Sequence, residues 1–483
     1  MCDTTMTHFS PLLVISASNI FMKRSDFPNN RFCIAVGLVL TASLLFFRNL
    51  HTYTSIFVAA QIQKTKIRNM TTSTLPLQFP DETWFEDVFG FHERTHKEYE
   101  MTRERFQLMQ SQSSDPSTKL RWIGDDGKPS SQPPIEITFG SFLTPSVQDL
   151  RLECKHLQEQ LQKNKFKTPQ EEASKQCLRQ GKTKILWRNV EGSVLDLHAD
   201  PQNTGAIFQA ASQFNCLEFP QPLSLPENGI TNYAWDHTQG PACAIACGAG
   251  TAFRNYLVPM PNGTVGQSAK HQINTLQAVL ERLTVLNNDK PIRVKVKDGY
   301  ANSINKHLYA VHDLLAEHSD DLRSLLRVGI QRDTEVTYPV LTGRTVTQVY
   351  CSAVPISYSQ ASADAWKPLA QIILQGAYEA TLLEGVRQHL ILLQQQQESS
   401  DKLSSPVSLP PPPPPTKIYL TLVGGGVFGN DLSWIWQAME YAHKAVASYP
   451  VVLDVAIVHY SGIPEGAQVL VKELNAQSHQ QQQ

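Results

Sequence analysis

Residues 418–430 read IYLTLVGGGVFGN, so an apolar, β-rich run ends in three consecutive glycines. An amphipathic segment follows to about residue 447, with Trp434, Ile435, Ala438, Met439 and Ala442 at helical spacing. A second apolar run at residues 451–460, VVLDVAIVHY, predicts a buried strand. Strand, loop, helix and strand together form a βαβ unit, which indicates a parallel sheet covered by helices.

The glycine loop between strand and helix has the composition of a phosphate site. Glycine adopts positive φ and lets a ligand approach the backbone closely. The helix that follows offers free N–H groups and the positive end of its dipole. The sequence therefore predicts that this loop holds a phosphate or a diphosphate.

Length and composition limit the number of domains and the kinds of partner that we expect. A chain of 483 residues with 41% hydrophobic residues can form one large domain or two ordinary ones. The net charge of −2 gives no basic footprint, so we expect no nucleic-acid partner. The eight cysteines form no CxxC pair, and we expect neither a metal centre nor a cofactor.

The N-terminal part carries an uncharged, apolar run from Phe32 to Phe47, FCIAVGLVLTASLLFF. It is short for a membrane-spanning helix, which needs ~20 residues. Three interpretations stay open: a signal-anchor helix, a targeting segment, and an upstream extension that is absent from the mature protein. A retained segment predicts a membrane-anchored or organelle-targeted protein, and its loss predicts a cytoplasmic one.

Composition shifts divide the chain into four parts. We expect a leader over residues 1–75, a mostly helical accessory segment over 76–180, a large α/β domain over 181–465 and a disordered tail over 466–483. We expect the aromatic group of Trp84, Phe85, Phe89 and Phe91 to pack the accessory segment onto the α/β domain.

Two insertions interrupt the predicted α/β domain, at about residues 259–345 and 394–416. The second contains a glutamine run and six prolines at residues 410–415, and polyproline does not pack into a sheet. It is interpreted as a surface insertion or as a polyproline ligand for a partner with an aromatic groove.

The order of these elements resembles the C-terminal half of macro domains, which bind ADP-ribose in a three-layer α/β/α sandwich. The turn that wraps the diphosphate in that family is matched here by Gly424, Gly425, Gly426, Val427, Phe428, Gly429 and Asn430. The segment YCSAVP at residues 350–355 is similar to the strand before the family's long helix. The resemblance implies a three-layer sandwich with ADP-ribose or an ADP-ribosylated protein as its partner.

An earlier segment extends the resemblance. In AASQFNCLE, at residues 210–218, a predicted strand leads into Asn215, and the resemblance implies that Asn215 contacts the distal ribose. The segment QGPACAIACGAG, which begins with Gln239 and Gly240, stands where the family has its first small-residue loop. No run of three glycines is followed by paired Gln and Glu, the signature of poly-ADP-ribose glycohydrolase-like members. The resemblance therefore implies binding more directly than catalysis.

Polar residues near the predicted loops are the candidates for chemistry. Asp236 or Glu218 would orient a ribose hydroxyl or activate a water, and the alternative for Asp236 is a capping or Asx turn. Arg254 would bind a phosphate in a bidentate manner, and its alternative is an ordinary ion pair.

Three functions follow from these residues. The first is a binder of ADP-ribose or a related nucleotide diphosphate, with hydrolysis of ADP-ribosyl bonds as an extension. The second is an NAD(P)-dependent oxidoreductase, because Gly424, Gly426 and Gly429 meet the GxGxxG spacing. The third is a noncatalytic interaction protein that uses the polyproline insertion.

Overall fold

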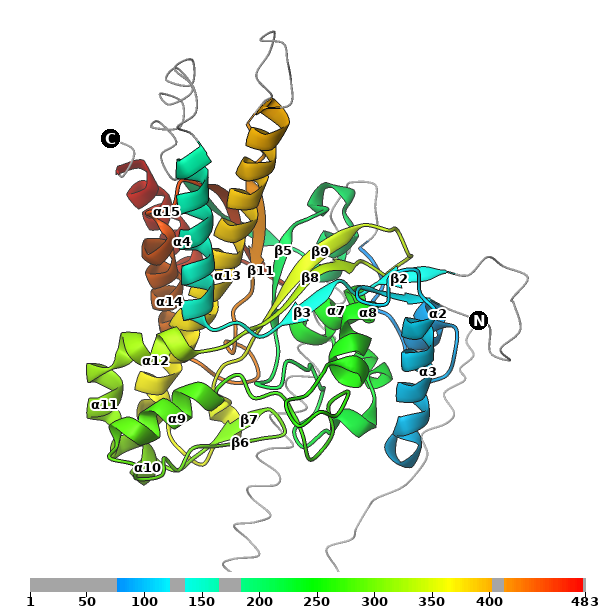
Figure 1. The fold of residues 1–483 in the computed structure, drawn as a ribbon. Helices are drawn as coiled ribbons and strands as arrows, with labels where there is room; N and C mark the ends of the chain where they lie inside the picture. Colours follow the sequence, from blue (N-terminus) through cyan, green and yellow to red (C-terminus); the bar gives the residue numbers. More distant parts are fainter. Residues whose placement is uncertain (1–75, 122–134, 165–183, 402–411, 481–483) are drawn as a thin grey trace, which may run out of the picture. The chain divides into compact units, whose positions relative to one another are not determined.

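A seven-stranded sheet forms the centre of the computed structural model (Figure 1), which describes residues 76–121, 135–164, 184–401 and 412–480. Its strand order is β3 (Ser141–Leu143), β8 (Gly329–Glu335), β9 (Thr345–Cys351), β5 (Ile207–Ala211), β10 (Thr416–Leu420), β11 (Val452–His459) and β4 (Lys184–Glu191). The five strands from β9 to β4 are parallel, and β3 and β8 pair antiparallel at one edge.

Helices cover both faces of this sheet, which gives three layers (Figure 1). One layer comprises α4 (Val147–Asn164), α12 (Ser319–Leu325), α13 (Ala363–Asp401), α14 (Leu432–Val446) and α15 (Glu465–Gln480). The other comprises α6 (Val194–Ala199), α7 (Gln239–Ala246) and α8 (Gly248–Ala252). In β10, Ile418 and Leu420 join the core under α13 and α14, while Tyr419 joins the core of the opposite face. The predicted α/β sandwich is confirmed.

The predicted βαβ unit is β10, α14 and β11. The two strands are adjacent and parallel, with Ile418 opposite Val455. Trp434, Ile435, Ala438, Met439 and Ala442 are buried, as their helical spacing predicts. The residues that read as strand and helix in the sequence therefore form those elements, because their apolar faces meet the same core.

Three buried glutamines lie on neighbouring strands of the sheet, and each donates a hydrogen bond. Gln209 on β5 donates to Thr381 Oγ1 at 2.9 Å, and Gln348 on β9 donates to the Cys243 carbonyl at 2.8 Å. Gln331 on β8 donates to the carbonyl of Phe139 at 2.6 Å. A buried amide without a partner is costly, so these bonds tie the sheet to the elements around it.

The segment over residues 76–180 differs from the predicted accessory segment. It contains α2 (Trp84–Phe89), α3 (Tyr99–Ser111) and the two-stranded β1 (Lys119–Arg121) and β2 (Glu136–Thr138), but β3 and α4 belong to the central sandwich. The prediction failed because β3 is only three residues long and pairs with β8, far away in sequence. The predicted aromatic packing is confirmed, since Phe85 and Phe89 share a core with Phe253 and Tyr256 of the α/β domain.

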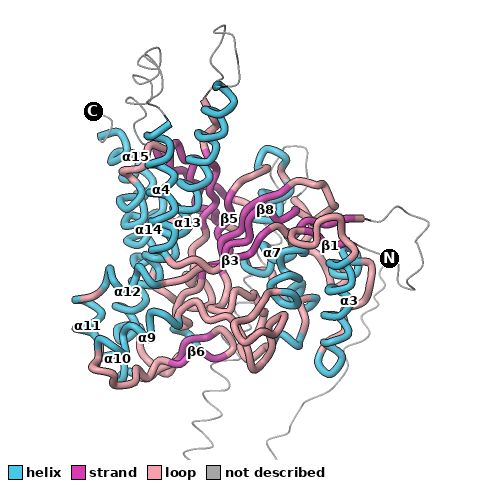
Figure 2. Tube along the Cα trace, in the orientation of Figure 1, coloured by secondary structure: helices cyan, strands magenta, loops and turns pink. Residues whose placement is uncertain are grey.

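The predicted insertion at residues 259–345 is folded and partly joins the sheet. It holds α9 (Gln277–Leu286), the hairpin of β6 (Lys295–Lys297) and β7 (Tyr300–Asn302), α10 (Asn305–Tyr309), α11 (His312–Glu317), α12 and finally β8. These short helices, strands and loops are shown by type in Figure 2. Because β8 pairs with β9, only the residues before it form an addition to the sandwich.

Two predicted irregular regions are helical. Helix α13 runs through the glutamine residues to Asp401, because glutamine is a good helix former, and the insertion predicted from residue 394 therefore begins later. The prediction of a disordered tail from residue 466 is wrong, since α15 occupies residues 465–480. Leu470 and Leu474 are buried, and the Asn475 side chain exchanges two 2.9 Å hydrogen bonds with the Trp187 backbone.

Two predictions fall on residues outside the described ranges. The apolar run from Phe32 to Phe47 lies there, as do residues 410 and 411 of the polyproline segment. Among the residues that the structure describes, no helix combines the length and apolarity needed to cross a bilayer. Membrane anchoring through the N-terminal run stays a prediction.

Candidate functional site

The glycine turn, which we define as residues 424–430, stands at the carboxyl end of β10, between β5 and β11. Gly424 has a φ of 73°, and a Cβ there would lie 2.4 Å from the Cβ of Ala353. The amide of Asn430 donates to the Gly424 carbonyl at 2.9 Å, which closes the turn. Glycine is therefore required at residue 424 both for its backbone angle and for the space.

The middle of the glycine turn presents backbone donors to the surface. Gly426 and Val427 are exposed, and a Cβ at Gly426 would meet no atom within 4 Å. Among the described residues, no acceptor pairs with the amide N–H groups of Gly426, Val427 or Phe428. Consecutive free N–H groups in a turn are an arrangement that binds anions. The predicted phosphate contact of this loop stays a prediction.

Asn430 holds the glycine turn in place. Its side chain is buried and donates to the carbonyls of Val354 at 2.8 Å and Gly424 at 3.2 Å. The amide of Ser357 donates to the Phe428 carbonyl at 3.1 Å, which adds a second link to the loop after β9. Asn430 is thus placed to fix the turn, and its predicted ligand contact stays a prediction.

The N-terminus of α14 is occupied by a side chain of the protein itself. Asp431 caps the helix, and its carboxylate accepts a hydrogen bond from the Ser433 amide at 2.7 Å. Hydrogen bonds from Ser433 lower the pKa of Asp431, so this carboxylate is ionised at neutral pH. The expectation that the helix start itself binds phosphate is therefore not supported, because a negative charge already sits there.

Three aromatic rings from separate segments meet beside the glycine turn. The ring centroid of Phe428 lies 5.7 Å from that of Tyr300 and 6.1 Å from that of Tyr358. Tyr358 is 40% exposed, and Tyr300 and Phe428 are half-buried. We call these residues the aromatic trio. Flat, partly exposed rings beside free amides suit a ligand that carries a base or a sugar next to its phosphates.

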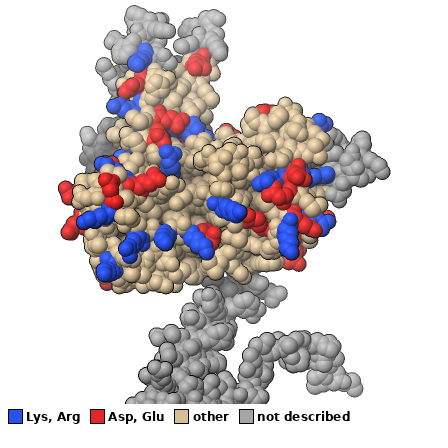
Figure 3. Space-filling view, turned by 60° about the horizontal axis from the view of Figure 1, so that its bottom comes forward, with Lys and Arg blue, Asp and Glu red and all other residues tan. Residues whose placement is uncertain are grey.

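The hairpin that supplies Tyr300 also carries positive charge. Arg293, Lys295 and Lys297 alternate along it and are all exposed. Figure 3 shows lysine and arginine side chains across the face that it presents, mixed with aspartate and glutamate side chains. The turn of the hairpin is Asp298 and Gly299, with φ of 51° and 79°, which matches a tight two-residue hairpin. This local charge favours an anionic ligand near the aromatic trio.

The first residue of α7, Gln239, binds the end of β5. Gln239 accepts from the Ala211 amide and donates to the Gln209 carbonyl, both at 2.8 Å, so its side chain extends the strand's pairing. A Cβ at Gly240 would lie 2.0 Å from the Ala211 carbonyl oxygen. Both residues therefore join the start of α7 to β5, and their contact with a ligand stays a prediction.

Asn215 is fully buried beneath the hairpin turn. Its side-chain amide donates to Gln272 at 2.9 Å, and its oxygen accepts from the Leu217 amide at 3.1 Å. A Cβ at Gly299 would lie 2.9 Å from the Asn215 Cγ. The predicted ribose contact would need these bonds to be exchanged and the hairpin to move, so it stays a prediction.

Glu218 and Arg254 form a buried ion pair. Arg254 Nη2 lies 3.1 Å from a Glu218 carboxylate oxygen, and neither side chain is exposed. Arg254 also donates to the Cys216 carbonyl at 3.0 Å, and its guanidinium lies 3.6 Å from the centre of the Tyr350 ring. The ion-pair alternative for Arg254 thus describes this structure, in which the guanidinium has no exposed face for a phosphate.

The second carboxylate oxygen of Glu218 is buried and has no hydrogen-bond partner among the described residues. Burial raises the pKa of Glu218 to about 7, although Arg254 acts in the opposite direction. A side chain that solvent does not reach cannot activate a water in this conformation, so the predicted catalytic role of Glu218 is not supported by its position.

Asp236 lies in a turn and is only half-buried. Its carboxylate accepts a hydrogen bond from the Thr238 amide at 2.9 Å, which is the Asx turn expected as its structural alternative. Burial raises the pKa of Tyr300, and the negative charge of Asp236 raises it further, which places Asp236 within electrostatic reach of the aromatic trio. Of the two predicted catalytic carboxylates, Asp236 is the one that remains accessible.

Three residues near the glycine turn were not predicted from the sequence: Tyr300, Tyr358 and Lys367. Lys367 is exposed near the start of α13, and its charge contributes to lowering the pKa of Asp431 beside the glycine turn. A signal existed for Tyr300, because Asp-Gly between alternating residues predicts a hairpin at that point. Nothing in the sequence brings Tyr358 to Tyr300, since their contact depends on the folded insertion.

Comparison with known proteins gives similarity in structure alone. No protein-family model matches this chain, and no curated protein matches its sequence. The chain is similar to poly(ADP-ribose) glycohydrolase from Deinococcus radiodurans in complex with ADP-ribose, with 12% identity, a TM-score of 0.30, and coverage of 70% of this chain and 94% of that one.

A second similar protein is poly(ADP-ribose) glycohydrolase from Thermomonospora curvata. Its structure bound to the inhibitor ADP-HPD has 11% identity and a TM-score of 0.27, with coverage of 78% of this chain and 96% of that one. Another structure of the same enzyme has 11% identity and a TM-score of 0.29. At these values, a functional assignment must rest on the residues of this chain.

Proposed function

We propose that this protein binds ADP-ribose or a closely related nucleoside diphosphate at the glycine turn. One observation carries the proposal: the amides of Gly426, Val427 and Phe428 lie in an exposed turn at the carboxyl end of a parallel strand and pair with no described acceptor. Ligands of open α/β sheets bind at this end of the strands. The resemblance to macro domains selects ADP-ribose among the diphosphates.

The groups around the glycine turn would each contact or attract a different part of the ligand. The free amides would donate to the phosphate oxygens, and the aromatic trio would stack against the base or a ribose. The cations on the β6–β7 hairpin would raise the local concentration of an anionic ligand. Affinity would thus come mainly from backbone groups and ring faces.

Hydrolysis of an ADP-ribosyl bond is the second part of the proposal and rests on Asp236. Its carboxylate is the accessible one of the two predicted acids and lies within electrostatic reach of Tyr300. A carboxylate in that position would activate a water for attack on the ribosyl carbon. Asp236→Asn is expected to retain ADP-ribose binding and to abolish release of ADP-ribose from an ADP-ribosylated protein.

The binding proposal is tested by charge reversal in the glycine turn. A Cβ at Gly426 meets no atom within 4 Å, so Gly426→Glu and Gly426→Lys should both fold. The glutamate would place a negative charge among the free amides, whereas the lysine has similar length and the opposite charge. Affinity for ADP-ribose, ADP and NAD is measured by calorimetry on the full chain and both variants.

We expect the unsubstituted chain to bind ADP-ribose, Gly426→Glu to bind at least tenfold more weakly, and Gly426→Lys to bind more tightly than Gly426→Glu. Equal affinities in the two variants would show that charge at the turn plays no part. If the unsubstituted chain binds none of the three compounds, the proposal is wrong. Binding of NAD alone would favour the oxidoreductase alternative.

One contact in the structure argues against the oxidoreductase alternative. A dinucleotide site needs an acidic residue at the end of the next strand to hold the ribose hydroxyls. Asp454 lies within β11, and its carboxylate pairs with Arg188 Nε on β4 at 2.8 Å. Asp454 is therefore engaged inside the sheet, at a distance along the strand from the glycine turn.

A further inference from the structure

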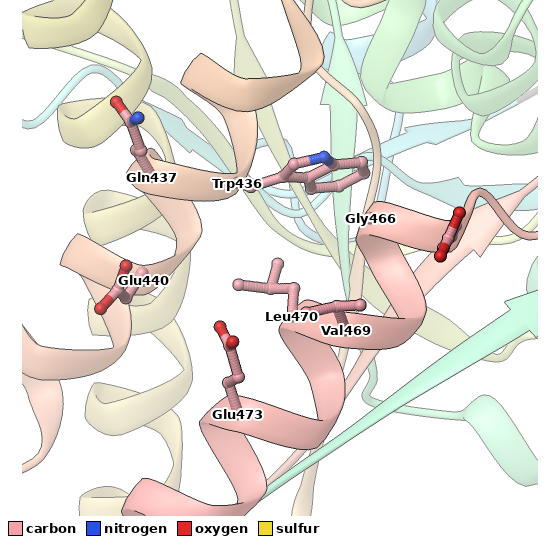
Figure 4. A pocket seen from close by; sticks show the side chains of 8 residues that line it. Trp436, Gln437, Glu440, Gly466, Val469, Leu470 and Glu473 are labelled. Atoms are coloured by element: carbon pink, nitrogen blue, oxygen red, sulfur yellow. The ribbon is translucent and has the colours of Figure 1, made fainter.

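A depression of about 390 Å³ lies between α14 and α15, separate from the glycine turn. Trp436, Val469 and Leu470 form its apolar surface, and Glu440, Glu465 and Glu473 stand around them. Figure 4 shows the indole of Trp436 over one end and the leucine and valine side chains beside it. We call this depression the α14–α15 groove.

The groove owes its shape to the contact between Trp436 and Gly466. A Cβ at Gly466 would come within 2.7 Å of the indole nitrogen, so only glycine lets the ring lie against the start of α15. Trp436 is half-buried, and its N–H donates to no acceptor among the described residues. Val469 is 48% exposed, which is high for a branched apolar side chain within a helix pair.

Of the three carboxylates around this apolar surface, one has a cationic partner and two have none within the described residues. Glu440 pairs with Lys444 one turn further along α14, at 2.6 Å. In the part of the chain that the structure describes, Glu465 and Glu473 pair with no cation. An apolar surface between free carboxylates repels phosphates and other anions, so the groove does not suit the ligand proposed for the glycine turn.

We propose that the α14–α15 groove binds a partner polypeptide that presents a lysine or arginine among apolar side chains. The apolar part of the basic side chain would lie on Leu470 and Val469, and its charged end would reach Glu465 or Glu473. The face of Trp436 adds attraction for a cation. An amphipathic basic helix combines both properties and lies in a groove between two helices. This proposal does not depend on nucleotide binding.

A pair of labelled model peptides tests the proposal on the full chain. The first is an amphipathic helical peptide of leucine and lysine, and the second replaces every lysine with glutamate. Binding is followed by fluorescence anisotropy. The test variant is Glu465→Gln with Glu473→Gln, and the matched control is Glu86→Gln with Glu104→Gln, exposed residues on α2 and α3.

We expect the leucine–lysine peptide to bind the unsubstituted chain and the control equally. We expect its Kd to rise at least tenfold in Glu465→Gln/Glu473→Gln, and the leucine–glutamate peptide not to bind. Equal binding to test and control variants would overturn the proposal, because the peptide would then bind elsewhere. Absence of binding to the unsubstituted chain would also overturn it, and would be the outcome if another part of this chain or a second copy fills the groove.

Discussion

The glycine turn after β10 and the Glu218–Arg254 pair after β5 lie at the same end of the sheet but use polar groups in opposite ways. The glycine turn carries no charged side chain, and three of its backbone amides have no described acceptor. The pair joins an arginine and a glutamate with no exposed side-chain surface. The residues with the most reactive side chains thus serve the structure, and the residues with the least reactive ones face solvent.

The two regions show that a site predicted from charged residues and a site predicted from glycines fail or hold for different reasons. A charged residue after a strand suggests chemistry, yet burial turns it into a structural element once a partner of opposite charge is near. A glycine run suggests backbone exposure. In the described ranges, no acceptor pairs with the amides of residues 426–428. Four predictions test whether the two regions are as distinct as their geometry indicates.

The largest expected effect is on the buried pair. Arg254→Met should lower the free energy of unfolding by about 3–5 kcal/mol, because Glu218 is left buried without its partner. Urea unfolding measures the change. Arg188→Met is the control, since the Arg188–Asp454 pair is partly exposed and should be worth at most ~1 kcal/mol. If both variants lose the same free energy, burial has no special role at Arg254.

The next effect separates two glycines of the same turn. Gly424→Ala should destabilise the protein by about 2 kcal/mol, because alanine disfavours positive φ and its methyl would press on Ala353. Gly426→Ala should change stability by less than ~0.5 kcal/mol. Thermal unfolding of the two variants gives the comparison. Equal losses would mean that the turn has a different backbone in solution.

A smaller effect is expected from the aromatic trio. Tyr358→Ala should weaken ADP-ribose binding several-fold, about 1 kcal/mol, through the loss of ring stacking. Stability should change little, because Tyr358 is 40% exposed. Calorimetric titration measures the affinity, and Tyr309→Ala, an exposed tyrosine on α10, provides the control. An unchanged affinity would remove the trio from the proposed site.

The last prediction concerns a slope of stability with pH at Glu218. Burial raises its pKa from 4.5 to about 7, so between these values the folded state binds more protons than the unfolded state. The stabilisation from this group is full below pH 4.5 and declines as pH rises toward 7, by at most ~1.4 kcal/mol per pH unit. Glu218→Gln removes this slope.

The slope is measured from the unfolding free energies of the unsubstituted chain and of Glu218→Gln at several pH values between 4.5 and 7. The quantity of interest is the difference between the two at each pH. Taking the difference matters because other groups have the opposite sign. Burial lowers the pKa of His198 to about 4, so that group stabilises the protein as pH rises, in both proteins alike. A parallel pH profile in the two proteins would show that Glu218 has an ordinary pKa in the folded state.

The sequence predicted the fold where the signal was local. The βαβ unit of β10, α14 and β11 follows from apolar periodicity, and the glycine turn from composition. The sequence could not predict that β3 joins the sheet, because three residues carry no periodicity and their partner β8 is about 190 residues away. It could not predict α15 as a packed helix, since its burial depends on β4.

The candidate site was predicted less completely than the fold. Backbone exposure at Gly426 followed from the sequence, but the cap at Asp431 and the approach of Tyr300 depend on tertiary contacts. The role of Arg254 could not be predicted either. A phosphate-binding arginine and an arginine in an ion pair differ here in burial, and burial is a property of the whole fold.

The buried glutamines of β5, β8 and β9 have a consequence for strand alignment. A strand that slid by two residues would keep its alternation of faces, and the hydrophobic effect alone would tolerate that error. Such a slide would leave the amides of Gln209, Gln331 and Gln348 facing apolar neighbours without acceptors, at about 1–3 kcal/mol for each. These amides therefore act against misaligned sheets, and so help to make a single alignment the lowest in free energy.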